Sequence, residues 1–339
     1  MGVNKWLLNK FKHINKERLN KHVEILSKES CKPEFIIKID MFINFLTRGS
    51  GYTDYFRGNY INLTRKEKNT FVTAKKFYKI LDYLNDSNYT KFLNNKLLFN
   101  LKFKDYLKRD YIDLNECSYK ELEKFILDKK TVFAKQVNGE GGHGIRKIKY
   151  SDVKDFKALY KELVTNNQAL LEEEIKQCKE VNAINPNVVN SFRVVTLYKD
   201  GKVYILGNAF RINQDDSNII GCTNDIYFSL NKEGFIDSNV IDDYGNIYTH
   251  HPLTKCDFSK VRIPKVDEAF KMCIDAHNRI KEVRYIGWDI AFSDKGPVMV
   301  EGNEYPGYGI IQFYKLKNKN TGHLKEISDI LGDEMKNIK

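Results

Sequence analysis

Apolar residues recur at helical spacing along the first ninety residues of the chain. One apolar stripe runs through residues 4–28. A second stripe covers residues 33–49, which begin with a proline suited to a first helical turn and end with a glycine suited to a helix stop. Thr64 and Glu67 have the spacing of a capping box, which predicts a further helix that runs to about residue 86.

Beyond residue 90 the pattern mixes short helices with strands. A capping box at Ser118 and Glu121 predicts a helix that ends near residue 128, and Ser151-Asp152 predicts the start of another. Strands are predicted at 131–136, 145–150, 168–172, 191–198, 202–211, 225–230, 234–241, 285–292 and 297–302. Longer helices are predicted at about 265–283 and 322–337. Because the elements alternate without strict βαβ order, an α+β architecture is favoured.

Length and composition are those of a folded protein with a sizeable core. The chain has 339 residues, enough for two or three domains, and 42% of them are hydrophobic. No run approaches the ~20 apolar residues of a membrane span, and the first residues do not predict a secretory signal. The six cysteines are scattered without close pairs, which indicates reduced thiols in the cytoplasm and no zinc site.

The net charge of +11 indicates affinity for polyanions, such as nucleotides, nucleic acid, anionic lipid or acidic sugars. A general compositional bias toward lysine would give the same excess without any specific partner, so both explanations stay open. The helix predicted in residues 4–28 has a lysine-rich face and Trp6. It leaves open a weak association with a membrane surface, with packing on the body of the protein as the alternative.

A glycine-rich loop joins the strands predicted at 131–136 and 145–150. Its sequence, Gly139-Glu-Gly-Gly-His-Gly144, matches G-x-G-x-x-G, but a dinucleotide-binding loop must lead into a helix. No Walker A lysine follows, and the protein-kinase motifs are missing, since Lys135 precedes the loop and neither His-Arg-Asp nor Asp-Phe-Gly occurs. A glycine loop between two strands instead predicts a flap whose N–H groups bind phosphates. The alternative is a hairpin turn without chemical use.

A second hairpin carries carboxylates in an apolar setting. Ser293-Asp-Lys-Gly296 predicts a turn, and a three-residue loop would place Asp289 opposite Glu301, with Asn303 on the same face. Two neighbouring carboxylates repel each other, and a hard divalent cation removes that cost. Mg²⁺ suits the pattern, because it needs few protein oxygens and completes its shell with phosphate and water. The alternative is an exposed polar edge.

Taken together, these features resemble the ATP-grasp superfamily, and most closely the sugar-transfer-associated ATP-grasp proteins of polysaccharide biosynthesis. The resemblance runs in order over about residues 50–312. The segments that carry it are Asp54-Tyr55-Phe56, Asn95-Lys96-Leu-Leu-Phe99, the strand end Glu172 to Ile175, Asn190-Ser-Phe-Arg193-Val-Val-Thr196, Gly287-Trp-Asp-Ile290 and Glu301-Gly-Asn303 with Pro306-Gly307. The combination is specific, although no single motif is.

The resemblance implies three groups of site residues. The nucleotide-binding group would be Lys96, Lys135, Gly139, Gly141, Gly142, His143, Gly144, Glu172, Glu173, Glu174, Ile175 and Glu180. The magnesium ligands would be Asp289, Glu301 and Asn303. The catalytic residues would be Arg193 and Arg211, which would face the transferred phosphoryl group or an acidic substrate. A salt-bridge role at a strand end is the alternative for Arg193, and the role of Arg211 is equally open.

Within the nucleotide group, the resemblance implies that each part of ATP has its own contacts. The two lysines would hold the phosphates, and the flap would close over them. The strand end at residues 172–175 would meet the adenine through backbone groups, and Glu180 would bind the ribose hydroxyls. His143 is not required by the family pattern, and a solvated side chain is the alternative reading for it.

The implied fold is an α+β ATP-grasp fold, in which two α+β subdomains grip ATP, with a helical N-terminal region. The α/β domain that precedes the grasp in many family members is not evident, because the first ninety residues read as helical. We place the boundaries at 1–90 for the helical region, 91–170 for the small subdomain with the flap, 171–320 for the large subdomain with the metal hairpin, and 321–339 for a C-terminal helix.

The implied activity is that of an ADP-forming carboxylate–amine ligase that works through an acyl phosphate. It would join an amino acid or amine to a sugar acid in the biosynthesis of capsule or another surface polysaccharide. The partners would be ATP, Mg²⁺, a carboxylate and an amine, without nucleic acid, in the cytoplasm or at the inner face of the membrane. A kinase using the same nucleotide site is the alternative. A basic binding protein without activity is disfavoured, because simple binding needs no converging carboxylates.

Overall fold

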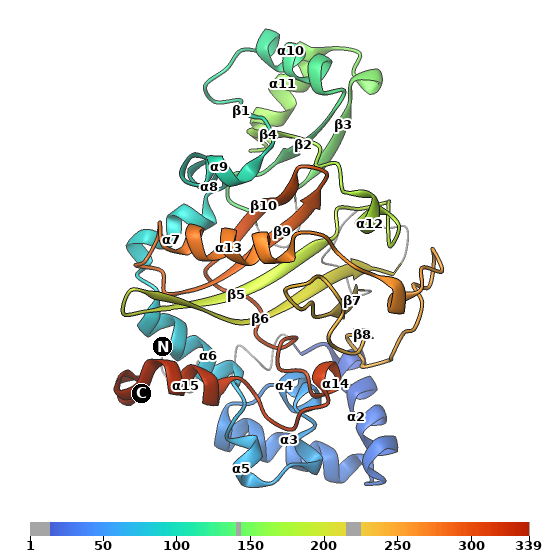
Figure 1. Ribbon diagram of the computed structural model, residues 1–339, viewed down its shortest axis with the longest axis vertical. Coiled ribbons are helices and arrows are strands. Elements are labelled where there is room, and N and C mark those ends of the chain that lie inside the picture. Colours follow the sequence, from blue (N-terminus) through green and yellow to red (C-terminus); the bar gives the residue numbers. More distant parts are fainter. Residues whose placement is uncertain (1–13, 140–143, 215–224, 339) are drawn as a thin grey trace. The chain divides into compact units, whose positions relative to one another are not determined.

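The computed structural model describes residues 14–139, 144–214 and 225–338 (Figure 1). The chain divides into two compact units, each considered on its own below. Unit 1 comprises residues 1–80 and 308–339, and unit 2 comprises residues 81–307. The two chain ends therefore belong to the same unit.

Unit 1 is built from helices in the residues that the structure describes. They are α2 (Lys16–Ser30), α3 (Glu34–Arg48), α4 (Tyr52–Arg57), α5 (Arg65–Lys68), α6 (Ala74–Leu84, which runs on into unit 2), α14 (Tyr314–Lys317) and α15 (Leu324–Leu331), with 3-10 turns η1 (Tyr60–Asn62) and η4 (Gly332–Asn337). The predicted helical character of the N-terminal region is confirmed from residue 16 onward. Residues 4–13 of the first predicted stripe lie outside the described ranges.

One predicted helix of unit 1 is broken in two. The capping box is present, since Thr64 N donates to Glu67 Oε2 over 2.7 Å and Glu67 N donates to Thr64 Oγ1 over 3.3 Å. It starts only the single turn of α5, however, and α6 begins afresh at Ala74. Beside that break, the buried Asp54 carboxylate accepts hydrogen bonds from Ala74 N over 2.9 Å and from Tyr308 Oη over 2.8 Å, which ties the C-terminal segment to the N-terminal helices.

The smaller sheet of unit 2 is antiparallel, in the order β1-β4-β2-β3. Its strands are β1 (Tyr111–Asp113), β4 (Leu170–Glu173), β2 (Thr131–Lys135) and β3 (Arg146–Lys149). Helices α10 (Tyr119–Lys129) and α11 (Phe156–Thr165) supply the rest of its core. The sequence did not predict β1, which is three residues long and has no alternating pattern. The helix predicted from Ser151 was wrong in its start, because Asp155 caps α11 through Lys157 N and Ala158 N.

The larger sheet of unit 2 is also antiparallel, in the order β10-β9-β5-β6-β7-β8. Its strands are β10 (Gly296–Asn303), β9 (Tyr285–Ser293), β5 (Ser191–Lys199), β6 (Lys202–Asn213), β7 (Asp225–Phe228) and β8 (Ile241–Asp242). Helix α13 (Val266–His277) packs on one face and leaves the other face for polar side chains. The remaining elements of the unit are α7 (Ser87–Asn94), α8 (Lys96–Lys102), α9 (Lys104–Leu107), α12 (Lys179–Asn182) and the 3-10 turns η2 (Tyr150–Asp152) and η3 (Phe258–Lys260).

Two predicted elements in the second half of the unit were wrong in extent. The strand predicted at 234–241 is mostly turns and isolated bridges, and only its last residue enters β8. The helix predicted at 265–283 ends at His277, because the chain turns back there and His277 Nε2 donates to Val283 O over 3.0 Å. Its other ring nitrogen therefore accepts from the Thr196 hydroxyl, which in turn accepts a hydrogen bond from Trp288 Nε1. This buried chain fixes Trp288, the residue before Asp289.

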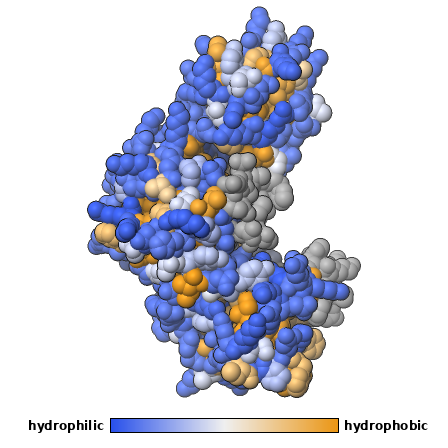
Figure 2. Space-filling view, turned by 90° about the vertical axis from the view of Figure 1, so that its right-hand side faces the viewer, coloured by the Kyte–Doolittle hydropathy of each residue, from blue (hydrophilic) through white to orange (hydrophobic). Residues whose placement is uncertain are grey.

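The surface is largely hydrophilic on the side of the molecule seen in Figure 2, where hydrophobic residues form separate patches. Across the described ranges, every helix is too short or too polar to cross a bilayer.

Candidate functional site

The hairpin of β9 and β10 brings Asp289 and Glu301 together. Its turn is one residue shorter than predicted, because Ser293 pairs with Gly296. That register alone would place Val300 opposite Asp289. The register shifts between Met299 and Glu301, however, and this β-bulge restores the pairing of Asp289 with Glu301. The predicted juxtaposition is therefore confirmed, although its cause is a bulge and not a longer turn.

Asn303 completes this group of oxygen-bearing side chains. Its Nδ2 lies 3.4 Å from Asp289 Oδ2 and 3.4 Å from Glu301 Oε1. Among the described residues there is no cluster of three or more His, Cys, Asp and Glu side chains arranged for a metal. A cation at this hairpin would thus rely on two carboxylates and one amide, a small set of the kind that Mg²⁺ uses when phosphates and water supply its other ligands.

The two carboxylates differ in their charge environment. Burial would raise the pKa of Asp289, but the charge of Arg193 and its paired hydrogen bonds outweigh burial and lower that pKa. The pKa of Glu301 is raised, first by burial and then by the charge of Asp289. The charges of Arg193, Lys96 and Lys135 oppose this rise, which places both lysines within electrostatic reach of Glu301.

Arg193 and Arg211 lie on the same polar face of the larger sheet. Arg193 pairs with Asp289 across β5 and β9, and Arg211 lies diagonally from it on β6, since Ser191 pairs with Arg211. Arg211 Nε donates to the buried Asp225 Oδ2 over 2.5 Å, and its guanidinium lies 5.9 Å from the centre of the Tyr227 ring. The structure thus brings both predicted arginines to the face that carries the hairpin carboxylates.

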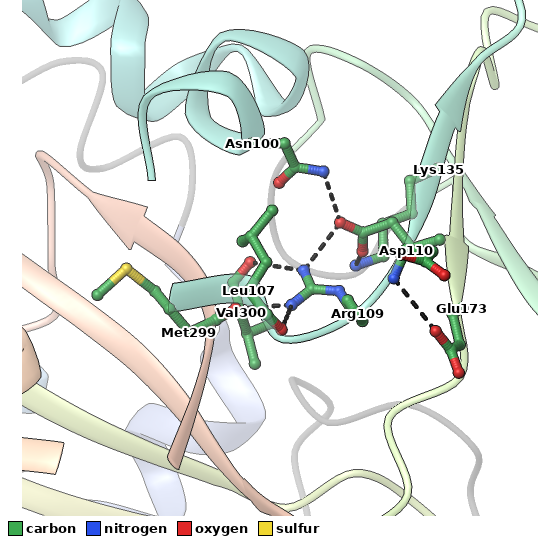
Figure 3. A network of polar contacts seen from close by, with 9 residues as sticks. Asn100, Leu107, Arg109, Asp110, Lys135, Glu173, Met299 and Val300 are labelled. Atoms are coloured by element: carbon green, nitrogen blue, oxygen red, sulfur yellow. Dashed lines mark hydrogen bonds and ion pairs between the residues drawn. The ribbon is translucent and has the colours of Figure 1, made fainter. Parts of the chain in front are cut away.

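A buried carboxylate on the smaller sheet anchors Lys135. Glu172 is only 2% exposed, and its two oxygens accept hydrogen bonds from Lys135 Nζ, from Arg109 Nη2 over 2.8 Å and from Asn100 Nδ2 over 2.8 Å (Figure 3). Burial would raise the pKa of Glu172, but the positive charges of Arg109 and Lys135 lower it well below its usual value. The carboxylate is therefore ionised, and it holds the Lys135 ammonium in place.

Arg109 links this network to the β9–β10 hairpin. Its guanidinium also donates to Met299 O over 2.7 Å and approaches Val300 O at 3.4 Å (Figure 3). These two carbonyls belong to the bulge that sets the position of Glu301. One side chain therefore joins the lysine of the smaller sheet to the backbone that places a hairpin carboxylate in the larger sheet.

Lys96 contacts the start of the glycine loop. It is the first residue of α8, whose N-cap is Asn95. Lys96 N donates to Val137 O over 3.0 Å, and its ammonium group donates to Gly139 O. Lys96, Lys135 and the start of the glycine loop are thus neighbours, as the sequence predicted.

The model of the sugar-transfer associated ATP-grasp family matches residues 78–326, which make up most of the chain. The chain belongs to this family. The predicted α+β fold with N-terminal helices is confirmed as an ATP-grasp fold. The match includes both sheets of unit 2 and every residue described above for the site.

Three solved structures are similar to parts of this ATP-grasp chain. D-alanyl-alanine synthetase A from Vibrio cholerae has a TM-score of 0.47 and 12% identity, over 71% of this chain and 65% of that one. The ATP-grasp ligase PsnB with a minimal precursor has a TM-score of 0.44 and 14% identity, over 73% and 64%. The D-alanine-D-alanine ligase from Coxiella burnetii has a TM-score of 0.43 and 12% identity, over 75% and 61%. The chain thus spans less than two thirds of the length of these proteins. No curated protein matches it.

The glycine loop of this ATP-grasp chain is a hairpin connection. Strands β2 and β3 pair in antiparallel fashion on either side of it, so the predicted strand–loop–strand arrangement is confirmed. Gly144 has a φ of +73° and its carbonyl accepts from Gln168 Nε2 over 2.9 Å. An added Cβ there would come within 2.6 Å of the Gln136 side chain. Gly141, Gly142 and His143 lie outside the described residues.

The residues predicted to meet the adenine and ribose follow β4. The Glu173 carboxylate accepts from Asp110 N over 3.1 Å, and Glu174 pairs with Lys147 over 2.6 Å. Ile175 is half-buried. Glu180 lies in the first turn of α12 and lines a surface pocket together with residues of the segment 256–267. The structure therefore places Glu180 in a different group of side chains from the lysines and hairpin carboxylates.

Sequence reasoning missed several residues that shape this site. They are Asn100, Arg109, Asp225 and Tyr227. Each of them contacts a residue that the sequence did predict, either Glu172 or Arg211. Arg109 stands in the charged run Lys108-Arg109-Asp110, which reads as ordinary surface sequence. Asp225 opens a predicted strand, where a carboxylate has no obvious role. No local signal separates these residues from surface charges.

Proposed function

We propose that this chain is an ADP-forming ligase that joins a carboxylate to an amine at the expense of ATP. The observation that carries the proposal is the meeting of Asp289, Glu301 and Asn303 with Arg193 on one sheet face, within electrostatic reach of Lys96 and Lys135. A buried and a half-buried carboxylate beside three cations and a glycine hairpin suit a nucleoside triphosphate and its metal.

The donor set fits Mg²⁺. Two carboxylates and an amide converge, and the raised pKa of Glu301 shows that one of them is ionised at a cost when no cation is near. Asp289, Glu301 and Asn303 would hold the ion, and when bound it would neutralise phosphate charge. Lys96 and Lys135 would bind phosphate oxygens as point charges, and the glycine hairpin would cover them.

The reaction would take place in two balanced displacements. A substrate carboxylate oxygen attacks the γ-phosphorus of ATP, and the bond to the β-γ bridging oxygen breaks to release ADP. The amine then attacks the carbonyl carbon of the acyl phosphate, phosphate leaves with the bonding electrons, and the nitrogen loses a proton to water. Arg193 and Arg211 would stabilise the negative charge that develops on the transferred group, while the rigid sheet holds the reactants in line.

The family description and the charge of the site support a substrate class. The family is associated with sugar transfer, which supports a sugar acid as the carboxylate and an amino acid or amine as the nucleophile. We place the reaction in the cytoplasm, in the biosynthesis of capsule or another surface polysaccharide. Two arginines on one face favour an anionic substrate.

The direct test is ADP release from ATP and Mg²⁺ across paired panels of sugar acids and amines, with mass spectrometry of the products. A ligase should need both partners and yield an amide together with ADP and phosphate. Release of ADP with a phosphorylated hydroxyl and no need for an amine would identify a kinase instead. If no pair gives ADP release above that of Glu301→Gln, the ligase proposal is wrong.

Lys135→Ala should lose most of the rise in melting temperature that ATP with Mg²⁺ produces. A ligand that binds only the native state stabilises it, by about 2.7 kcal/mol at a concentration of 100 times Kd. We expect the substitution to weaken ATP binding at least about tenfold, since a charged contact to phosphate is lost. The ligand-free variant should melt at a lower temperature than the wild type, because Glu172 loses one of its two cations, but it should still fold, because Glu172 keeps Arg109 and Asn100. The shift is therefore measured against the ligand-free variant. Lys149→Ala, which removes an exposed lysine from the neighbouring strand β3, is the matched control. An unchanged shift in Lys135→Ala would remove Lys135 from the site.

Arg193→Lys should reduce turnover by about a hundredfold and change the ATP-induced melting shift little. Lysine keeps the charge but cannot reproduce the paired hydrogen bonds to Asp289 or present a planar fork to the transferred group. Steady-state kinetics and melting curves on the same preparation separate the two effects. Arg146→Lys, at an exposed ion pair with Glu162, is the control. Wild-type turnover in Arg193→Lys would mean that the guanidinium has no special role.

A further inference from the structure

Helix α3 exposes a continuous row of large hydrophobic side chains. These residues form what we call the α3 apolar face, and their exposed fractions lie between 39% and 61%: Phe35, Ile36, Ile39, Phe42, Ile43 and Leu46. At the helical spacing of 100° per residue they fall within one arc of the helix surface. A patch of this kind, on the order of several hundred Å², equals the largest apolar patch of a typical monomer and marks an interaction site.

The α3 apolar face is not the result of a poorly packed helix. The opposite side of α3 is buried through Ile37, Met41 and Asn44, and the helix packs against α2 and α4. The helix is capped by Gly49, whose N–H donates to Phe45 O over 3.0 Å. One side of α3 thus belongs to the core of unit 1, while the other side, equally apolar, is presented to the surroundings.

The charge of the protein is concentrated in the same unit. Residues 1–80 and 308–339 contain 23 Lys and Arg against 11 Asp and Glu, a net charge of +12. Residues 81–307 contain 33 and 34, a net charge of −1. The whole positive excess of the chain therefore lies in the unit that carries the α3 apolar face.

These observations select one kind of partner. A second copy of the chain would bring another surface of the same strong positive charge to the contact, and like charges oppose such an association. An anionic bilayer has an apolar interior that can take up the hydrophobic side chains of the face. It also has negatively charged headgroups that attract the positively charged unit. We infer that the α3 apolar face docks unit 1 on an anionic lipid bilayer.

The docking mode is that of an interfacial helix. The side chains of the α3 apolar face enter the boundary between headgroups and acyl chains, and the helix axis lies parallel to the surface. Lys28 and Lys38, on and beside α3, form exposed ion pairs with Glu24 and Glu34. The attraction to anionic lipid therefore comes from the net charge of the whole unit, whose basic residues remain at the headgroup level. This attraction acts over a Debye length, so salt must weaken it. The inference does not depend on the ligase activity.

The test is co-sedimentation of the full-length protein with phosphatidylglycerol–phosphatidylcholine vesicles, compared with phosphatidylcholine vesicles alone. We expect binding to the anionic vesicles at least about tenfold tighter, and weaker as salt is raised. The double variant Phe42→Asn with Leu46→Asn should bind the anionic vesicles at least about tenfold more weakly, because two inserted side chains are lost. Both positions are exposed, so the melting temperature should be unchanged.

The matched control is Ile247→Asn with Leu253→Asn, which removes two exposed apolar side chains from unit 2 (63% and 42% exposed) and should bind as the wild type does. Equal affinity for both kinds of vesicle would overturn the inference, as would a Phe42/Leu46 variant that binds like the wild type. Sedimentation equilibrium is run in parallel. A wild-type dimer that the same double substitution dissociates would assign the face to a second copy and overturn the bilayer.

Discussion

In EDTA, Glu301→Gln is expected to have a melting temperature equal to or above that of the wild type. Its ATP-dependent turnover is expected to be lower than that of the wild type by a factor of at least about a thousand. The pKa of Glu301 is raised in the folded protein by burial and by Asp289. An acid with a raised pKa in the folded state costs stability as the pH rises above its unfolded-state pKa, and the full cost is reached above the folded-state pKa, because the unfolded chain ionises it more easily. Glutamine keeps the shape and removes that cost. With Mg²⁺ and ATP the same change removes a ligand, so turnover falls.

The control for this prediction is Asp294→Asn, which neutralises an exposed carboxylate in the turn of the same hairpin. It should leave both the melting temperature and the turnover as they are. A pair that serves only the fold would behave differently, because Glu301→Gln would then lower the melting temperature with and without Mg²⁺ and ATP. Full turnover in Glu301→Gln would dismiss the metal assignment and most of the ligase proposal.

The hairpin shows how far sequence reasoning reaches. Alternation along β9 and β10 identified the two strands, and the polar residues on them identified the candidate ligands. The facing of Asp289 and Glu301 was predicted from a three-residue loop, whereas the structure has a shorter turn and a bulge at Val300. The predicted loop was one residue too long and the predicted strand lacked the one-residue bulge, and these two errors cancelled. A bulge depends on contacts from outside the hairpin, here from Arg109, so the hairpin sequence alone does not encode it.

Local signals performed well where the determinant is local. The capping boxes at Thr64 and Ser118 are formed, and the glycine loop connects two paired strands. The failures lie where tertiary contacts decide. Strand β1 is too short to show a pattern, and it exists because it pairs with β4. The segment 234–240 alternates like a strand but bridges to Arg262 and turns away.

Glu172 illustrates a failure of a different kind. The family resemblance implied a backbone contact to adenine at this position, and its acidic side chain had no stated role. In the structure the side chain is the buried centre that joins Lys135, Arg109 and Asn100 (Figure 3). These partners come from positions 37, 63 and 72 residues away along the chain. No periodicity or motif links residues at such separations, so only the fold reveals the network.

Arg109 should be a positioning residue whose loss affects both Lys135 and the β9–β10 hairpin. Its guanidinium donates to Glu172 from Nη2 and to the Met299 carbonyl of the bulge from Nη1, and lysine has only one nitrogen in place of this planar pair. Arg109→Met should destabilise the protein by about 3 kcal/mol, because a buried carboxylate loses one of its cations. Arg109→Lys should recover much of that stability, since the charge beside Glu172 returns.

The decisive measurement is the kinetics of Arg109→Lys. With Glu172 and Lys135 still paired, its ATP affinity should stay within about threefold of wild type. Its kcat should fall at least about tenfold, because the bulge that aims Glu301 has lost a donor and a small displacement of a metal ligand is costly. Arg279→Lys, at an exposed pair with Asp105, is the matched control and should change neither value. Wild-type kcat in Arg109→Lys would show that the carbonyl contacts do not place the hairpin. If Arg109→Met has wild-type kcat at a low temperature at which it is folded, Arg109 only stabilises the protein and does not position the site.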